Sequence, residues 1–337
     1  MVKIGIVGSG FGLYGLLPAF NSTKSCHVVC ICGRETERLI NYCQSIGLGK
    51  IYTNWREMLQ KEKLDALAIA TPPNEQYKIA KVAINKGLHI FAEKPLAASF
   101  TQAKELLDLA KKKKIITAVD FLFPEIRKWQ EVKKIIDRKK YGNLKHIDLN
   151  WDFLSYDVKN KKSSWKTDIT LGGGALSFYF SHSLYYLEYF AGKILKFKSK
   201  LSYSKESLNG GEVGINLTLN FENNVTGKAH FNCNNKKVTR HQLTFICEKA
   251  KIILENKNGI TSSFRIKVFY EDDKIKKLTI PEDEDLEENV DERVIPVRRI
   301  ATRFIESITY KKEVRPSFKD GVRVQELIEK IRTNNNV

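Results

Sequence analysis

The first 121 residues alternate between short apolar segments and helical segments, and this alternation restricts the possible folds more than any other feature of the sequence. Apolar strands that alternate with helices form a parallel sheet with helices on both faces. We therefore predict an α/β fold that begins with a doubly wound parallel sheet. Its expected strands are residues 3–8, 27–32, 66–71, 89–92 and 116–121, and its clearest helices are residues 75–86 and 100–112.

A glycine-rich turn connects the first predicted strand to a helix. Gly8, Gly10 and Gly12 surround Phe11 in this turn. Glycines at such a position allow backbone N–H groups and the positive end of the helix to approach a pyrophosphate. Leu13 occupies the third fingerprint position, where glycine or alanine is usual, so an ordinary strand-to-helix turn is the alternative. The turn predicts a dinucleotide site that includes these three glycines and Phe11.

The second predicted strand ends in Gly33 and Arg34, where folds that prefer NAD usually carry an acidic residue. A carboxylate would repel a 2′-phosphate, whereas a guanidinium group holds a phosphate with paired, charged hydrogen bonds. The alternative is a surface arginine at a strand end. We predict that Gly33 and Arg34 bind the cofactor, with NADP as first choice and NAD as second.

Two further turns follow the strands 66–71 and 89–92. Because the carboxyl ends of parallel strands meet at one edge of a sheet, where ligands bind, both turns are expected to line one crevice. Lys94 precedes Pro95, so its backbone is held extended and its cation can be aimed at that crevice. The alternative is a solvated lysine at a strand end. The cofactor-binding residues predicted in these turns are Thr71, Pro72, Asn74, Glu93 and Lys94.

The pattern changes beyond Gly142 from long helices to strands with period two. We predict an antiparallel sheet with one polar face, interrupted by a helix over 175–190 that three glycines precede. The expected division is a dinucleotide-binding domain of residues 1–121 and an α+β domain of residues 122–337 for substrate binding and oligomerisation. The strands are predicted at 146–153, 196–203, 213–222, 225–233, 239–248, 252–255 and 264–270, and closing helices at 297–309 and 319–332.

Composition excludes several classes of function. The net charge of +18 comes from lysines scattered over many helices, without a recognisable nucleic-acid motif, so no nucleic-acid partner is expected. No apolar run reaches membrane length, and the first strand begins at Val2, which predicts a soluble, cytoplasmic protein. The six cysteines form no CxxC pair and no Cys/His cluster at metal-ligand spacing, so no metal site is expected.

Five motifs in order resemble the Gfo/Idh/MocA oxidoreductases, the family of glucose-fructose oxidoreductase and inositol 2-dehydrogenase. They are the glycine turn 8–12, the turns 71–74 and 93–95, the run 172–176 that leads to Ser181 and His182, and the segment 316–321. The resemblance implies a Rossmann domain and a C-terminal domain whose open sheet often forms the oligomer interface. It also implies hydride transfer between a nicotinamide and a hydroxyl or carbonyl carbon, usually of a sugar, in a homodimer or homotetramer.

The resemblance also implies roles for particular residues. The lysine of the Glu-Lys-Pro motif polarises the reacting oxygen and binds cofactor, which maps to Lys94, and a helix histidine faces the substrate, which maps to His182. Many members carry an aspartate four residues before that histidine, where this chain has Phe178. A subset that shares the segment 165–167 also lacks this aspartate and often has one three residues after the histidine, where this chain has Tyr185.

Chemical reasoning assigns these groups to hydride transfer. His182 has a suitable ordinary pKa for exchanging the hydroxyl proton, and Lys94 is expected to stabilise developing alkoxide charge on the same substrate oxygen. Tyr185 and Tyr179 are the reserve proton donors. The loop 157–168, which is basic in its middle, is expected to meet an anionic substrate such as a nucleotide sugar. The substrate-binding candidates are Lys94, Trp165, Lys166, Asp168 and His182.

A second hypothesis is a dinucleotide-binding regulatory or scaffold protein of the same fold, without turnover. Phe178, in place of the usual acid, favours it. The presence of both Lys94 and His182 opposes it, because a protein that only senses a dinucleotide needs neither a polarising cation nor a proton carrier.

Overall fold

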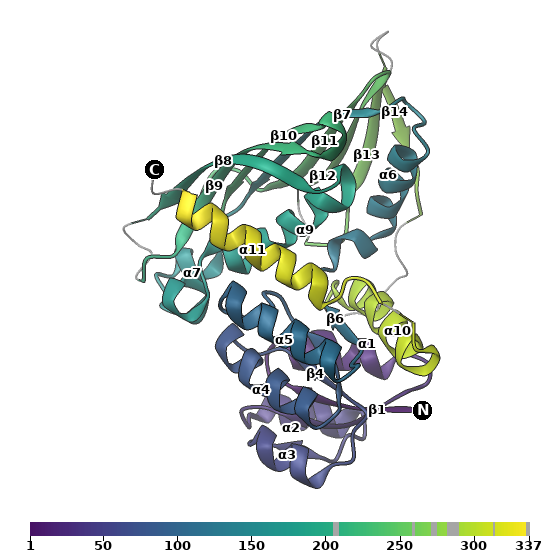
Figure 1. Ribbon diagram of the computed structural model, residues 1–337, viewed down its shortest axis with the longest axis vertical. Coiled ribbons are helices and arrows are strands. Elements are labelled where there is room, and N and C mark those ends of the chain that lie inside the picture. Colours follow the sequence, from purple (N-terminus) through teal and green to yellow (C-terminus); the bar gives the residue numbers. More distant parts are fainter. Residues whose placement is uncertain (205–208, 258–259, 271–274, 282–289, 313, 335–337) are drawn as a thin grey trace. The chain divides into compact units, whose positions relative to one another are not determined.

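The structure is a computed structural model, and it describes residues 1–204, 209–257, 260–270, 275–281, 290–312 and 314–334. The chain forms two compact units (Figure 1). The first unit comprises Met1–Leu122 and Leu286–Gln325, and the second comprises Phe123–Asp285 and Glu326–Val337. No helix among the described residues is long and apolar enough to cross a membrane.

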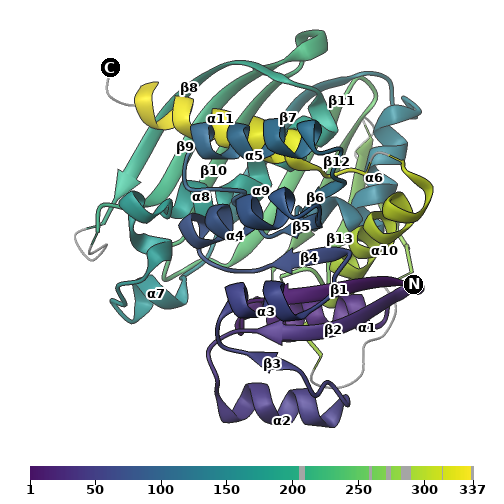
Figure 2. The ribbon, with the colours of Figure 1, turned by 60° about the horizontal axis from the view of Figure 1, so that its bottom comes forward.

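The first unit contains a six-stranded parallel sheet in the order β3-β2-β1-β4-β5-β6. Its strands are apolar and buried on both faces, which is typical of a sheet covered by helices. In Figures 1 and 2, α1 and α10 lie on one side of this sheet, and α4 and α5 lie on the other. The prediction of a doubly wound α/β fold is confirmed. The strands are β1 (Val2–Val7), β2 (Cys26–Cys32), β3 (Ile51–Tyr52), β4 (Ala66–Ile69), β5 (His89–Ala92) and β6 (Thr117–Val119).

The helices of this unit largely follow the predicted pattern, but the short strand β3 was not predicted. The helix after the glycine turn begins as a π-helical turn, η1 (Gly12–Leu16), and continues as α1 (Leu17–Asn21). Pro18 explains the wider turn, because its ring would clash with the carbonyl four residues before it in an α-helix. The other helices are α2 (Glu37–Ser45), α3 (Trp55–Lys61), α4 (Pro73–Asn85), α5 (Phe100–Lys112) and α10 (Val294–Tyr310).

Helix α10 belongs to the first unit although it comes late in the chain. Phe304 packs against Phe91 and Phe20, with ring centroids 5.9 and 6.4 Å apart, and all three rings are fully buried. The compact units therefore differ from the predicted division at residue 121, which placed this helix in the second domain. Helix α11 (Phe318–Asn334) starts in the first unit and ends in the second.

The second unit contains an eight-stranded sheet in the order β14-β13-β12-β11-β7-β10-β9-β8. One correction concerns direction, because β7 and β10 pair in parallel whereas every other neighbouring pair is antiparallel. A period of two predicts a strand but carries no information on its partner's direction. The strands are β7 (Leu144–Asp152), β8 (Ile194–Tyr203), β9 (Glu212–Phe221), β10 (Thr226–Asn232), β11 (Arg240–Cys247), β12 (Ala250–Asn256), β13 (Arg265–Tyr270) and β14 (Ile275–Leu278), of which β14 was not predicted.

The two faces of this sheet differ in polarity and burial, as the alternating pattern of β9 indicates. The apolar residues that alternate from Val213 to Phe221 are buried, while Asn216, Thr218 and Asn220 between them are exposed. Helices α6 and α8 pack on strands of this sheet, so the polar face is the open one. The helical elements of the unit are η2 (Phe123–Glu125), α6 (Arg127–Asp137), α7 (Tyr156–Lys159), η3 (Trp165–Thr167), η4 (Ile169–Leu171), α8 (Ala175–Phe178), α9 (Phe180–Ala191) and η5 (Glu222–Asn224).

The single helix predicted over 175–190 is wrong, because the structure divides it into α8 and α9. The break lies at Tyr179, whose ψ of −52° is helical but whose φ of −104° is not. The N–H of His182 donates to the carbonyl of Tyr179, three residues before it, at 3.2 Å. The helical hydrogen-bond ladder therefore shifts at this point, and the hydrophobic pattern does not reveal such a shift.

The packing of α10 leads to a prediction about stability. Replacing Phe304 by alanine leaves a cavity beside Phe20 and Phe91, so we expect a loss of about 3 to 5 kcal/mol in the free energy of unfolding of the first unit. Chemical denaturation monitored by circular dichroism measures it. The control is Tyr310→Ala on the same helix, where the side chain is 66% exposed. Equal effects of the two substitutions would contradict the assignment of α10 to this core.

Candidate functional site

The glycine turn after β1 combines a tight backbone with open space. Gly8 has a φ of +129°, and a Cβ atom on it would lie 2.3 Å from the carbonyl oxygen of Ala70. Only glycine fits there. A Cβ atom on Gly10 would meet nothing within 4 Å, so the turn is open at this residue. The turn therefore presents accessible backbone where a dinucleotide fold places the pyrophosphate.

Leu13 at the third fingerprint position does not disturb this arrangement. Its side chain is 2% exposed and belongs to the core. The helix packs against the strand at Gly12, where a Cβ atom would lie in ordinary contact, 3.4 Å from Cγ2 of Ile6. The N–H groups of the first turn of a helix have no acceptor within it, so they can donate to a ligand. The departure from the fingerprint is thus compatible with a dinucleotide site.

The end of β2 contacts the glycine turn directly. A Cβ atom on Gly33 would lie 2.5 Å from Cβ of Ser9, and the N–H of Arg34 donates to Oγ of Ser9 at 3.1 Å. The side chain of Arg34 is exposed. A second guanidinium group, which the sequence reasoning missed, lies nearby on α2: Arg38 stacks over the ring of Tyr14 at 4.8 Å.

The turn after β4 brings an unusual hydroxyl group to the same sheet edge. Oγ1 of Thr71 is buried and has no hydrogen-bond partner within the described part of the chain. Pro73 then begins α4, at the helix position that tolerates a missing N–H group. Pro72 is exposed, and Asn74 is half-buried in the first turn of this helix.

Gln76 of α4 holds the backbone of the turn that carries Lys94. It is 1% exposed, and its Nε2 group donates to the carbonyl oxygens of Glu93, Pro95 and Leu96 at 2.6, 3.0 and 3.1 Å. Lys94 itself is half-buried. The sequence reasoning missed Gln76, although a polar residue on the buried face of an amphipathic helix was a usable signal.

A charged group of residues lies next to this turn. Asp120 follows β6 and is 0% exposed. Burial is the main cause that raises the pKa of its carboxyl well above the usual value, and the charge of the neighbouring Glu93 is the second cause. Lys94 and Arg293 act in the opposite direction. Arg293 stacks over the ring of Phe11 in the glycine turn at 4.4 Å. Neither Asp120 nor Arg293 was among the predicted site residues.

These residues fit a nicotinamide dinucleotide at the carboxyl edge of the sheet. The glycine turn leaves the backbone of Gly10 open, the hydroxyl of Thr71 lacks a partner among the described residues, and cations stand at Arg34 and Lys94. Ligands of doubly wound sheets bind at this edge.

In the second unit, His182 lies on α9 in an aromatic environment. It is 7% exposed, and its ring meets that of Phe123 edge-on, with centroids 5.1 Å apart. Phe123 also contacts His241, which the sequence reasoning did not consider. His241 stacks on Trp151 at 4.3 Å, and burial lowers its pKa to about 3. His241 is therefore a neutral core residue.

The two tyrosines considered as reserve proton donors differ in environment. Tyr185 is half-buried on α9. Burial raises the pKa of Tyr179, whose ring packs on Phe153 and Phe178 at 5.0 and 4.5 Å. Tyr179 is thus held in the aromatic cluster.

Phe178, which replaces the usual aspartate, has a packing role. Its ring meets Trp165 edge-on at 5.3 Å, and the ammonium group of Lys166 lies 4.8 Å from its centroid. An apolar ring at this position therefore contacts two of the three predicted substrate-binding residues in this loop. The N–H of Gly174 donates to the carbonyl of Lys166 at 2.9 Å and completes this contact.

Asp168 caps the short helix η4. Its Oδ1 accepts from the N–H and the hydroxyl of Thr170 at 2.8 and 2.6 Å, and its Oδ2 accepts from Asn209 at 3.2 Å. The hydrogen bond from the Thr170 hydroxyl is the main cause that lowers the pKa of Asp168. These bonds give Asp168 a structural role in its loop.

Contacts within the second unit explain the glycine run. A Cβ atom on Gly173 would lie 1.9 Å from the carbonyl oxygen of Trp165, and one on Gly174 would lie 2.0 Å from Oε2 of Glu212. Glu212 is buried and pairs with Arg332, whose Nη2 group also donates to the carbonyl of Gly173 at 2.6 Å. The absence of side chains at Gly173 and Gly174 therefore lets this segment pack directly against Trp165 and Glu212.

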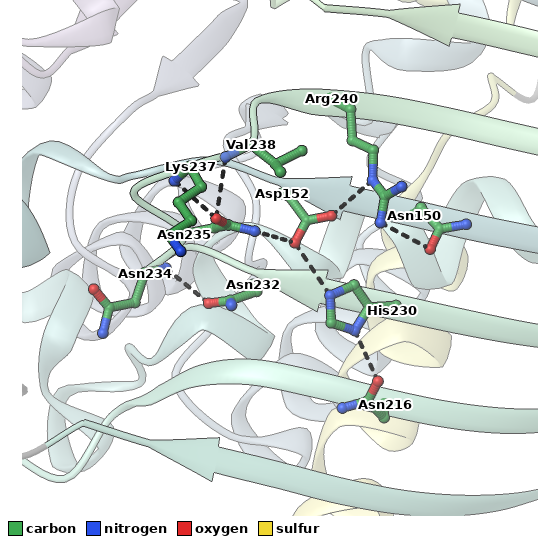
Figure 3. A network of polar contacts seen from close by, with 10 residues as sticks. All are labelled: Asn150, Asp152, Asn216, His230, Asn232, Asn234, Asn235, Lys237, Val238 and Arg240. Carbon is green, nitrogen blue, oxygen red and sulfur yellow. Dashed lines mark hydrogen bonds and ion pairs between the residues drawn. The ribbon is translucent and has the colours of Figure 1, made fainter.

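A polar network covers part of the open sheet face (Figure 3). Asp152 is 1% exposed and accepts from Nε of Arg240 at 2.8 Å, Nδ2 of Asn235 at 3.0 Å and Nε2 of His230 at 3.1 Å. Burial acts to raise the pKa of Asp152, but these bonds lower it overall. A groove of about 430 Å³ adjoins the network, with lysines 198, 200 and 228 in its lining. Among the described residues, no cluster of three or more His, Cys, Asp or Glu side chains could hold a metal ion.

Comparison with protein families gives two matches. Residues 2–121 match the model of an oxidoreductase family with an NAD-binding Rossmann fold, and residues 129–253 match the C-terminal domain of the Gfo/Idh/MocA proteins. Together the two models cover well over half of the chain.

Individual relatives agree with these matches. An uncharacterized oxidoreductase of Synechocystis is 28% identical over 97% of this chain and 92% of its own length. A dTDP-3,4-didehydro-2,6-dideoxy-alpha-D-glucose 3-reductase of Streptomyces violaceoruber is 24% identical over 52% of this chain and 50% of its own.

A solved structure of levoglucosan dehydrogenase with NADH and levoglucosan has a TM-score of 0.86 and 18% identity, over 99% of this chain and 97% of the other. At this identity the likeness concerns the fold. The chain thus belongs to the Gfo/Idh/MocA family of oxidoreductases with an NAD-binding Rossmann fold, and it is an NAD(P)-dependent dehydrogenase or reductase.

Proposed function

We propose that the protein transfers a hydride between NADP and a hydroxyl or carbonyl carbon of a sugar, a sugar derivative or a related small molecule. One observation carries the proposal: the open glycine turn at Gly10 and the half-buried Lys94 follow strands of one parallel sheet, at the edge where such sheets bind ligands. NAD is the second choice of cofactor.

The cofactor-binding residues are proposed from the turns of this edge. The backbone of the glycine turn would hold the pyrophosphate, and Arg34 would hold the 2′-phosphate that distinguishes NADP from NAD. When bound, the nicotinamide donates or accepts the hydride. The residues proposed for binding are Gly8, Gly10, Phe11, Gly12, Gly33, Arg34, Thr71, Pro72, Asn74, Glu93 and Lys94.

Lys94 is proposed to stabilise negative charge that develops on the reacting oxygen. A fixed cation in a site with little water performs this task without reorganisation during the reaction. The hydrogen bonds from Gln76 on both sides of Lys94 fix its backbone, which supports the role.

His182 is proposed to exchange the hydroxyl proton, with Tyr185 as the alternative donor. An imidazole suits this exchange near neutral pH. Both residues lie on α9, which follows the short helix α8 and the loop with the predicted substrate-binding residues Trp165, Lys166 and Asp168. Trp165 offers an aromatic face that suits a sugar ring.

The names of relatives support a carbohydrate substrate. One relative is a reductase of a dTDP-sugar, and one structural neighbour was solved with levoglucosan. Lys166 beside the aromatic rings of Trp165 and Phe178 would suit an anionic group of such a substrate. We also propose a cytoplasmic protein, because all six cysteines are free.

The alternative of a non-catalytic dinucleotide-binding protein gains no support from Phe178, whose ring packs on Trp165. A structural role for this ring is compatible with either function. Turnover with any sugar or nucleotide sugar in a screen of NADPH oxidation and NADP reduction would exclude a protein without activity.

Self-association as a homodimer or homotetramer is proposed for the open sheet face. This face is polar and carries lysines 198, 200 and 228, so two copies would bring like charges together. Because salt screens such repulsion, association should strengthen as salt rises. Light scattering at micromolar concentration, in low and high salt, should give the mass of two or four chains. A monomeric mass in both conditions would end this proposal.

The preference for NADP predicts the effect of Arg34→Ala. Charged hydrogen bonds to the 2′-phosphate contribute roughly 1.5 to 3 kcal/mol, so NADPH should bind about ten-fold to a hundred-fold more tightly than NADH. The substitution should remove most of this difference. Fluorescence titration of both reduced cofactors measures it, with Arg56→Ala, another exposed arginine of the first unit, as control. Equal affinities in the unsubstituted protein would overturn the preference.

The proposed roles of Lys94 and His182 predict different losses of rate. Lys94→Ala should lower turnover by about two to three orders of magnitude, and Lys94→Arg should restore little because a planar fork does not fit a point-charge site. His182→Ala should cost roughly 10² to 10⁴. Single-turnover rates with one active substrate, after cofactor affinity has been checked in each variant, measure these losses.

One combined outcome would change the assignment of the proton donor. If His182→Ala keeps nearly full turnover while Tyr185→Phe abolishes it, the tyrosine is the proton donor. The exposed Lys86 provides a control, since Lys86→Ala should have no effect on turnover.

A further inference from the structure

We propose that Asp120 is a positioning residue of the Lys94 turn, which acts as a neutral carboxylic acid and donates a hydrogen bond to the carboxylate of Glu93. The backbone places the two side chains together: β5 and β6 are neighbours, with Ala92 paired to Val119, and the N–H of Asp120 donates to the carbonyl of Ala92 at 2.9 Å. Asp120 and Glu93 are therefore the first residues after two adjacent strands.

The surroundings of Asp120 do not suit an ionised carboxylate. The side chain is 0% exposed, and no N–H or O–H group in the described part of the chain donates to either of its oxygens. A buried carboxylate without donors is strongly disfavoured. Its neighbour Glu93 can form a hydrogen bond with it only when one proton lies between the two carboxyl groups.

The charges around the pair lead to the same conclusion. The charged groups that act on Asp120 are Glu93, Lys94 and Arg293. Arg293 is already compensated by Asp291, which accepts from its Nε and Nη2 groups at 2.8 and 2.6 Å. Lys94 is the second cation that acts on the pair. One shared proton gives the pair a single negative charge, which balances Lys94 without a second buried anion.

The consequence for the site is a fixed Glu93. Its Oε2 accepts from the N–H of Lys94 at 3.2 Å, while Gln76 donates to its carbonyl at 2.6 Å. A hydrogen bond from Asp120 would give this carboxylate a second fixed contact. The turn would then be fixed through both its main chain and its side chain. This consequence for cofactor binding rests on the function proposed above, whereas the protonation of Asp120 does not.

Thermal unfolding of the apo protein as a function of pH tests the protonation. A carboxyl whose pKa is raised in the folded state contributes stability that is present below the unfolded pKa and is lost as pH rises through the folded pKa. Asp120→Asn removes this loss. The melting temperature of Asp120→Asn relative to the unsubstituted protein should therefore rise between about pH 4 and about pH 8.

The opposite trend would overturn the proposal. If Asp120 is an ionised partner of Lys94 or Arg293, Asp120→Asn should be the less stable protein from about pH 8 down to about pH 4, and the difference should be lost only as pH falls below about 4. Asp108→Asn provides the matched control for that trend, because the exposed Asp108 pairs with Lys104 and its pKa is lowered.

NADPH affinity tests the positioning role separately. Asp120→Leu cannot donate to Glu93 and should weaken NADPH binding about tenfold, whereas Asp120→Asn keeps a donor and should restore most of the affinity. Equal losses in both variants would contradict the positioning role. If the unsubstituted protein binds no NADPH, the proposed function fails, and the pH dependence of melting still decides whether Asp120 carries a proton.

Discussion

The hydrogen bonds from Gln76 to the turn after β5 are the interaction on which the candidate site depends. One buried amide group donates to the carbonyl oxygens of Glu93, Pro95 and Leu96, and it thereby holds the backbone on both sides of Lys94. A lysine side chain is long and flexible, so a fixed backbone is what gives its charge a defined position. Helix α4, which carries Gln76, starts at the neighbouring turn of the same sheet edge, so the two turns are positioned together.

At the same sheet edge, neighbouring glycines serve packing and ligand access separately. Gly8 passes against Ala70 so closely that no side chain fits, while Gly10, two residues later, faces open space. The first glycine is needed for the fold and the second for access to the backbone. In the second unit Gly173 and Gly174 are explained by contacts with Trp165 and Glu212, so glycine in a motif is no proof of ligand contact.

Much of the fold and part of the site could be predicted from local sequence. The strands of the first unit, the glycine turn and the turn of Lys94 each leave a pattern within a few residues. The parallel pairing of β7 with β10 and the packing of Phe304 on Phe20 could not be predicted, because both depend on partners far away in the chain. The roles of Gln76 and Asp120 could not be predicted for a related reason. Both depend on an interaction with Glu93, which is distant from them in the chain.

Hydrogen–deuterium exchange with and without NADPH tests most directly whether a dinucleotide binds at the carboxyl edge of the first sheet. Bound cofactor should slow exchange in peptides that cover residues 8–13, 70–76 and 92–96, because these turns form the proposed binding surface. Unchanged exchange in all three segments at saturating NADPH, or slowing confined to the second unit, would contradict binding at this edge.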